Sequence, residues 1–250
     1  TEQLYRGDAI TESRCAEAFS AVKQLESMNA AMHGALSNHS PVHDQEELFL
    51  EMASYAKSSG SCHEDVLYDG FDILLWAIEF GDDDILSYSN HWLVRACYLY
   101  AAELAMGEAQ ASEAMGLIFQ PDSQEILDLT DRIKRAFNGK LSSISPSRVL
   151  KLYLERIGVC FENKPPFNHP TAGLSFSLLP FSVSSVSMRK YSASILAAAV
   201  LIVGRRNAGI SPFWPQVLEQ MTGYSTDEGT TLSSAVAAVS SLPAGGAFEL

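Results

Sequence analysis

Few side chains in this sequence have the types and spacing that metal binding requires. Residues 82–84 are three consecutive aspartates that could hold a hard cation through carboxylate oxygens. No glycine or distal glutamate follows at the offsets of a calcium-binding loop, so a solvated turn is the simpler interpretation. His39 and His43 are four residues apart, but Pro41 between them prevents a shared helical face for zinc. The sequence therefore predicts no metal site.

Catalytic motifs are equally sparse. Cys62 precedes His63, but neighbours in sequence rarely act as nucleophile and base without a third group that orients the base. No glycine-rich nucleotide loop and no serine nucleophile motif occurs. The segment at 222–224 reads Thr-Gly-Tyr and has too few glycines to surround a phosphate. We expect a protein that is not an enzyme and that uses no cofactor.

The charge balance restricts the class of partner. The 250 residues include 17 Lys or Arg and 30 Asp or Glu, which gives a net charge of −13. Nucleic acid is disfavoured as a partner, because phosphate binding needs clustered cations, and a partner with a basic surface is favoured. The one basic concentration is at Arg189, Lys190, Arg205 and Arg206. These are interpreted as solvated helix ends, with an acidic or phosphorylated partner as the alternative.

Membrane insertion is not expected. The apolar, charge-free stretch at 191–204 has 14 residues, whereas a spanning helix needs about 20. A longer charge-free stretch at 165–188 contains four prolines, which a spanning helix would not accommodate. The four cysteines have no metal-ligand spacing. We interpret them as reduced thiols and expect an intracellular protein, nuclear, cytoplasmic or both.

Apolar residues recur every three or four positions in most segments, and no segment alternates with a period of two. This pattern predicts helices and no sheet. The expected helices are 11–36, 44–57, 64–80, 91–106, 112–119, 123–137, 146–157, 171–179, 191–203, 213–221 and 227–241.

The helical pattern occurs twice. We predict an all-α fold, with an N-terminal helix followed by two five-helix units at about 44–140 and 145–242. The corresponding domains would be residues 1–43, 44–142 and 143–250. In each unit the third helix is rich in small residues, which suggests that neighbouring helices enclose it. Ala102 and Ala198 are expected at the two centres.

Three segments of the second unit resemble the second box of a cyclin. Residues 194–200 read SILAAAV, and residues 213–225 read FWPQVLEQMTGYS. Residues 145–154, SPSRVLKLYL, resemble the segment that enters this box. The first unit is similar in helix order and more loosely in sequence, at 65–80 and 92–106. The resemblance implies two cyclin boxes and a regulatory subunit that binds and activates a cyclin-dependent-type protein kinase, with a role in the cell cycle.

The resemblance also places the residues that would contact the kinase. Glu103 occupies the position of a lysine that cyclins use on the third helix of the first box. Thr130 occupies the position of a glutamate on the fifth helix, and Asp131 follows it. These three residues are the expected kinase contacts, and the reversed charge at 103 implies a divergent cyclin.

A second implied site is a docking patch for substrates of the kinase. It would comprise Glu46, where an arginine is usual, Met52, where a tryptophan is usual, and Phe49 between them. An alternative function remains open, which is a cyclin-fold scaffold or adaptor with no kinase partner.

Overall fold

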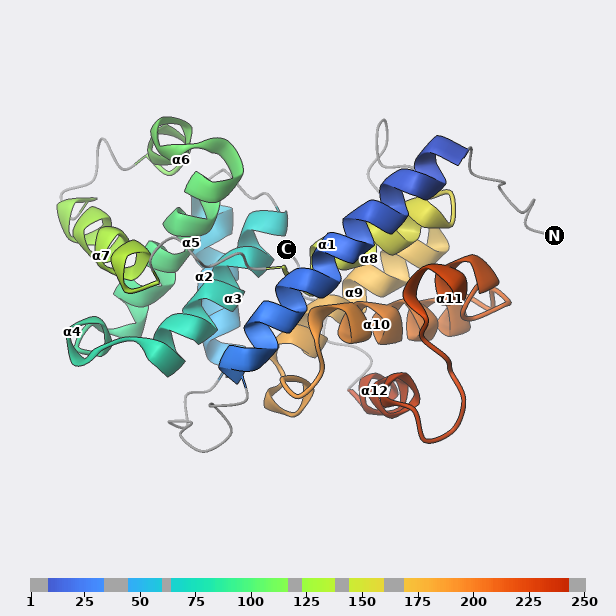
Figure 1. Cartoon of the computed structure of the whole chain (residues 1–250). Helices are drawn as coiled ribbons and strands as arrows, with labels where there is room; N and C mark the ends of the chain where they lie inside the picture. Colours follow the sequence, from blue (N-terminus) through green and yellow to red (C-terminus); the bar gives the residue numbers. More distant parts are fainter. Residues whose placement is uncertain are drawn as a thin grey trace. The chain divides into compact units, whose positions relative to one another are not determined.

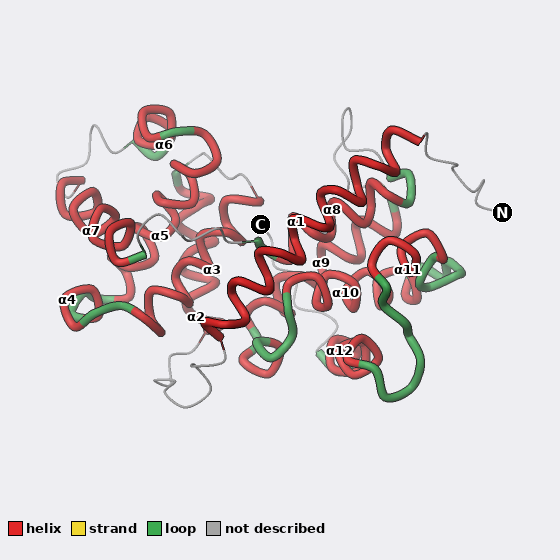
Figure 2. Tube along the Cα trace, viewed as in Figure 1, coloured by secondary structure: helices red, strands yellow, loops and turns green. Residues whose placement is uncertain are grey.

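The structure is a computed structural model that describes residues 9–33, 45–59, 64–116, 123–137, 144–159 and 169–242. These residues form twelve α-helices and a short 3-10 turn, with no strand in the same ranges (Figure 2). The predicted all-α class is confirmed. Within the described residues no helix is long and apolar enough to cross a bilayer.

The helices occur along the chain in the following order. The first is α1 (Ala9–His33). The next six are α2 (Gln45–Ser58), α3 (Glu64–Phe80), α4 (Asp83–Leu86), α5 (Asn90–Met106), α6 (Glu108–Ala114) and α7 (Ser123–Ala136). The last five are α8 (Pro146–Arg156), α9 (Pro170–Ser184), α10 (Ala193–Asn207), α11 (Gln216–Thr222) and α12 (Thr231–Ser240).

Several elements differ from the sequence prediction, and the additional helix α4 gives the first unit six described helices in place of the predicted five. The helix expected at 112–119 is α6 and begins earlier, because Gly107 adopts a φ of 90° and lets a new helix start at once. The aspartates at 82–84 do not form a plain turn, since Asp82 caps the short helix α4 by accepting a hydrogen bond from the Ile85 N–H. The helix expected at 171–179 is α9, which continues past Pro180 to Ser184.

The chain divides into two compact units, which we describe separately (Figure 1). The first unit comprises residues 31–145, and in it α5 packs against α2, α3, α6 and α7. The second unit comprises residues 1–30 and 146–249, and in it α10 packs against α8, α9 and α12. The helices that the sequence placed at the centres, α5 and α10, are therefore enclosed by neighbours.

Small side chains let helices approach closely in both units. A Cβ on Gly70 of α3 would lie 3.2 Å from the Cα of Tyr98 on α5. A Cβ on Gly204 of α10 would clash with the Oγ of Ser175 on α9. Ala102 and Ala198 are buried, which confirms their predicted place in the cores. The small residues therefore set the spacing of the central helices.

We expect Ala102→Leu to lower the free energy of unfolding by about 1–3 kcal/mol, because the added carbons have no space beside α5. Ala105→Leu is the matched control, since Ala105 lies on the same helix and is exposed. The control should change stability by about 0.5 kcal/mol or less. Urea unfolding of both variants measures the difference, and equal effects would show that α5 is not tightly enclosed at Ala102.

The N-terminal helix α1 is bonded to the start of α10. Glu26 accepts hydrogen bonds from the N–H and the hydroxyl of Ser194, at 2.7 and 2.8 Å. The Tyr224 hydroxyl lies 2.6 Å from the Ser194 Oγ and accepts a hydrogen bond from Lys23. Phe19 packs edge-on against the Tyr224 ring. These contacts make α1 part of the second unit. The predicted domain boundaries stay predictions.

The negative charge of the protein is concentrated in one unit. Residues 31–145 contain 19 acidic and 6 basic residues, whereas the rest of the chain contains 11 of each. The net charge of −13 therefore belongs entirely to the first unit. An electrostatic field of this kind attracts basic surfaces to the first unit and leaves the second unit close to neutral.

Candidate functional site

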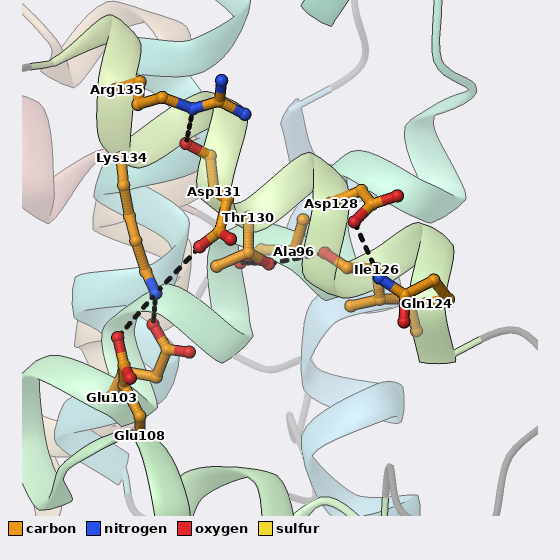
Figure 3. A network of polar contacts seen from close by, with 10 residues as sticks. All are labelled: Ala96, Glu103, Glu108, Gln124, Ile126, Asp128, Thr130, Asp131, Lys134 and Arg135. Atoms are coloured by element: carbon orange, nitrogen blue, oxygen red, sulfur yellow. Dashed lines mark hydrogen bonds and ion pairs between the residues drawn. The ribbon is translucent and has the colours of Figure 1, made fainter.

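Glu103 and Lys134 form an ion pair that joins α5 to α7 in the first unit (Figure 3). The Nζ of Lys134 lies 2.6 Å from the Oε2 of Glu103. The side chain of Glu103 is only 6% exposed, and that of Lys134 is 23% exposed. At this burial each charge needs the other, because an unpaired charge out of water is costly.

Two further carboxylates approach the same ammonium group. Glu108 lies 3.3 Å from the Nζ of Lys134, and Asp131 lies 3.4 Å from it. Gly107 makes the turn that brings α6, and so Glu108, to this position; its N–H donates to the Glu103 carbonyl at 2.8 Å. We call Glu103, Glu108, Asp131 and Lys134 the Lys134 cluster. One cation among three carboxylates leaves it with a net charge of −2.

The electrostatics of the cluster shift the pKa of both members of the buried pair. Burial raises the pKa of the Glu103 carboxyl above its usual value of 4.5; Lys134 opposes this, and Glu108 and Asp131 add to it. Burial lowers the pKa of Lys134, but the bond and charge of Glu103, with the other carboxylates, outweigh it and hold that pKa above its usual value. Lys134 is therefore charged at neutral pH.

The raised pKa of Glu103 gives a pH dependence with a definite sign. In the range just above pH 4.5 the folded chain binds a proton at Glu103 that the unfolded chain does not bind. Lowering the pH from 7 toward 4.5 should therefore stabilise the wild type relative to Glu103→Gln, which lacks this group. Urea unfolding of both proteins across this range tests it, and a difference that changes in the opposite direction would contradict the assignment.

The expected contact Thr130 lies in the core. Its side chain is fully buried, and its hydroxyl donates to the Ile126 carbonyl at 2.7 Å, with the Ala96 carbonyl at 3.4 Å (Figure 3). Asp131, the next residue, is exposed. The structure thus brings Glu103 and Asp131 together around Lys134 and turns Thr130 away from the surface.

The expected docking patch on α2 is divided in the same way. Glu46 is exposed, but Phe49 and Met52 are both fully buried. The Phe49 ring meets Phe71 edge-on with 5.0 Å between centroids. In this arrangement Phe49 and Met52 hold the core of the first unit together and present no side chain to a peptide.

The candidate metal and nucleophile residues give no site. No group of three or more His, Cys, Asp or Glu within the described residues is placed to hold a metal ion. His39, His43, Cys62 and His63 lie outside the described residues. Cys97 is buried, and burial raises the pKa of its thiol well above its usual value, so it remains protonated.

The segments that carried the resemblance converge in the second unit. The Nε1 of Trp214 donates to the Tyr224 carbonyl at 3.1 Å, which fixes the loop after α11. The Tyr153 hydroxyl donates to the Ser194 carbonyl at 3.2 Å. The Tyr153 and Trp214 rings also meet edge-on. Residues from α8, α10 and the loops around α11 thus form one packed cluster.

Comparison with known families identifies this arrangement. Residues 153–244 match the family model of the cyclin C-terminal domain. The match supports membership of the cyclin family and assigns a cyclin C-terminal domain to the second unit. The all-α structure is consistent with the cyclin-box fold. No curated protein matches the chain.

The sequence analysis missed Lys134, the partner of Glu103. The sequence alone gave no signal for this pairing, because the burial of Glu103 that calls for a cation is visible only in the structure. Lys134 lies in the last turn of α7, four residues after the position aligned with the cyclin glutamate. The cation thus lies on α7 and the carboxylate on α5, which is the reverse of the arrangement that the resemblance implies.

Proposed function

We propose that the protein is a regulatory subunit that binds and activates a cyclin-dependent-type protein kinase. The observation that carries this proposal is the cyclin C-terminal domain at residues 153–244, since cyclins are regulatory proteins. The protein would supply no catalytic group. It would act by binding the active arrangement of the kinase better than the inactive one and so shifting the population toward activity.

The proposed contact surface is the edge of the first unit formed by α5, α6 and α7. It includes Glu103 and Asp131 from the expected contacts, and we remove Thr130 from the set because it is buried. Leu104, the residue after Glu103, is exposed and adds an apolar side chain to this edge. The acidic excess of the first unit favours a kinase with a basic surface.

The proposal includes substrate docking on α2. Of the three expected residues only Glu46 faces solvent. Leu50, one helical turn further along, is exposed and could extend the patch. We also propose an intracellular location, nuclear or cytoplasmic, where such kinases act.

A specific observation supports the alternative, a cyclin-fold scaffold with no kinase. Glu103 is already paired with Lys134 within the chain, so it needs no partner group to neutralise it. A scaffold would keep this pair for stability alone. The two functions therefore differ in whether a kinase binds the edge beside the pair.

Affinity isolation of the full chain from its source cells, followed by mass spectrometry, tests the proposal. The wild type should enrich a cyclin-dependent-type kinase, and Leu104→Glu should lose it because a charge replaces an exposed apolar contact. Leu174→Glu is the matched control, since Leu174 is an exposed leucine of the second unit, on α9. Kinase enrichment that is absent, or equal for all three proteins, would contradict the proposed surface.

A further inference from the structure

We propose that a surface between α2 and α5 of the first unit binds an acidic peptide segment of a partner protein. Its central group is the guanidinium of Arg95, which lies over two aromatic rings and would donate hydrogen bonds to one Asp or Glu carboxylate of that segment. The Cζ of Arg95 is 5.1 Å from the centroid of the Tyr55 ring and 5.7 Å from that of the Trp92 ring. We call these three residues the Arg95 platform. The inference goes beyond kinase binding and does not depend on it.

The first observation is that Arg95 has no acceptor within the described part of the chain. The basic side chains on α7, which are Arg132, Lys134 and Arg135, each have an oxygen partner. The guanidinium of Arg95 has only the two rings as partners among the described residues. An unpaired cation is unexpected in a unit that contains 19 acidic and 6 basic residues. Its hydrogen-bond donors are therefore available to an acceptor outside the chain.

A carboxylate beside the platform is already engaged elsewhere. Glu51 is one helical turn before Tyr55 and lies on the same face of α2. Its Oε1 lies 2.8 Å from the Nδ1 of His91 on α5. The His91 ring in turn meets the Trp92 ring edge-on, with 5.9 Å between centroids. Glu51 is thus held on the His91 side and forms no ion pair with Arg95.

The direction of approach follows from which nitrogen is covered. The Nε of Arg95 is buried and has no hydrogen-bond partner among the described residues, whereas Arg95 as a whole is only half-buried. A carboxylate would therefore approach end-on and accept hydrogen bonds from the two terminal nitrogens in a bidentate pair. The hydroxyl of Tyr55 is also buried, so its ring supports the guanidinium and offers no donor to the partner.

The charge of the first unit limits what can occupy the platform. A net charge of −13 repels nucleic acids and anionic membranes over long distances. A short segment with one carboxylate meets less repulsion and gains a close contact with the guanidinium. Apolar residues beside that carboxylate would pack against the half-exposed Trp92 ring. An acidic peptide segment is thus the occupant that this surface fits.

The platform is separate from the surfaces described above. Nine residues, or about two and a half turns, separate Tyr55 from Glu46, so the two lie on opposite sides of α2. Arg95 lies about two turns before Glu103 on α5. Binding at the platform can therefore be tested independently of the proposed kinase contacts and of docking beside Glu46.

Peptide phage display on the immobilised full chain tests the inference. The selected peptides should share one Asp or Glu with apolar or aromatic neighbours. The most enriched peptide would then be synthesised and titrated with the chain by fluorescence anisotropy. Replacing its shared Asp or Glu with the corresponding amide should raise the Kd at least about tenfold, because a hydrogen-bonded charge pair is lost.

Variants of the chain assign the binding to the platform. Arg95→Gln should raise the Kd at least about tenfold, and Arg95→Lys several-fold, because lysine keeps the charge but cannot form the bidentate pair. The urea midpoint of Arg95→Lys should stay near that of the wild type, which separates loss of recognition from loss of the fold. Arg132→Gln is the matched control, since it changes the net charge equally and its arginine is paired with Asp84. It should leave the Kd unchanged.

Three results would overturn the inference. They are a selection that enriches no peptide, enriched peptides without a shared acidic residue, and a Kd that is the same for the wild type and Arg95→Gln. None of these results would affect the proposed kinase contacts.

Discussion

Phe49→Ala should lower the free energy of unfolding of the first unit by about 3–5 kcal/mol, the usual cost of removing a buried phenylalanine. Phe49 is 0% exposed and packs against the rings of Phe71 and Tyr68 from α3. Its loss leaves a cavity between α2 and α3 that the surrounding helices fill only in part. Urea unfolding followed by far-ultraviolet circular dichroism measures the change.

The matched control is Leu50→Ala, on the same helix and one residue further along. Leu50 is 47% exposed, so its truncation should change stability by about 0.5 kcal/mol or less. If Phe49→Ala were as mild as Leu50→Ala, Phe49 would be available at the surface, as the docking-patch interpretation requires. A large difference between the two places Phe49 in the core.

Glu26→Ala should destabilise the second unit by about 2–3 kcal/mol, because hydrogen bonds to a charged group contribute about 1.5–3 kcal/mol. The carboxylate of Glu26 accepts from both the N–H and the hydroxyl of Ser194, a fully buried residue in the first turn of α10. Without Glu26 the N–H of Ser194 loses its acceptor, and α1 loses its bond to α10.

Glu17→Ala on the same helix is the control, since the carboxylate of Glu17 accepts only an exposed hydrogen bond from Ser13. Hydrogen exchange resolved by segment is the suitable measurement, because it reports α1 and α10 separately. Glu26→Ala should speed exchange in both helices, whereas Glu17→Ala should leave α10 unchanged. Fast exchange confined to α1 would show that Glu26 does not support α10.

Much of the fold could be predicted from the sequence, because the spacing of apolar residues in a segment matches the face that the helix buries. The 3.6-residue period predicted α3 at the bounds that the structure shows, 64–80, and small residues marked α5 and α10 as the central helices. A helix with an apolar face of sufficient length can bury that face against several different neighbours. Such helices can therefore be predicted from the sequence without knowledge of the tertiary structure.

Other elements depended on local backbone chemistry. The start of α6 is set by the positive φ of Gly107, which a helical periodicity in the sequence does not reveal. The helix predicted at 171–179 continues past Pro180, which is buried, to Ser184. Packing against α10 compensates there for the missing backbone hydrogen bond.

The site was harder to predict from the sequence than the fold, because it depends on which side chains from distant segments come into contact. A sequence position alone does not show whether Thr130 or Asp131 faces solvent, since one residue of rotation on a helix exchanges them. The pairing of Glu103 with Lys134 joins positions 31 residues apart on two helices. Only the helix packing brings these charges together.

Reconstitution of kinase activity tests the central proposal most directly. The kinase isolated with the full chain would be purified alone, and its turnover of a peptide substrate would be measured as the chain is added. We predict a saturable rise of about tenfold or more, since an active state populated at 10% or less is driven toward full occupancy. Saturable binding with unchanged turnover would contradict the proposal and favour the scaffold.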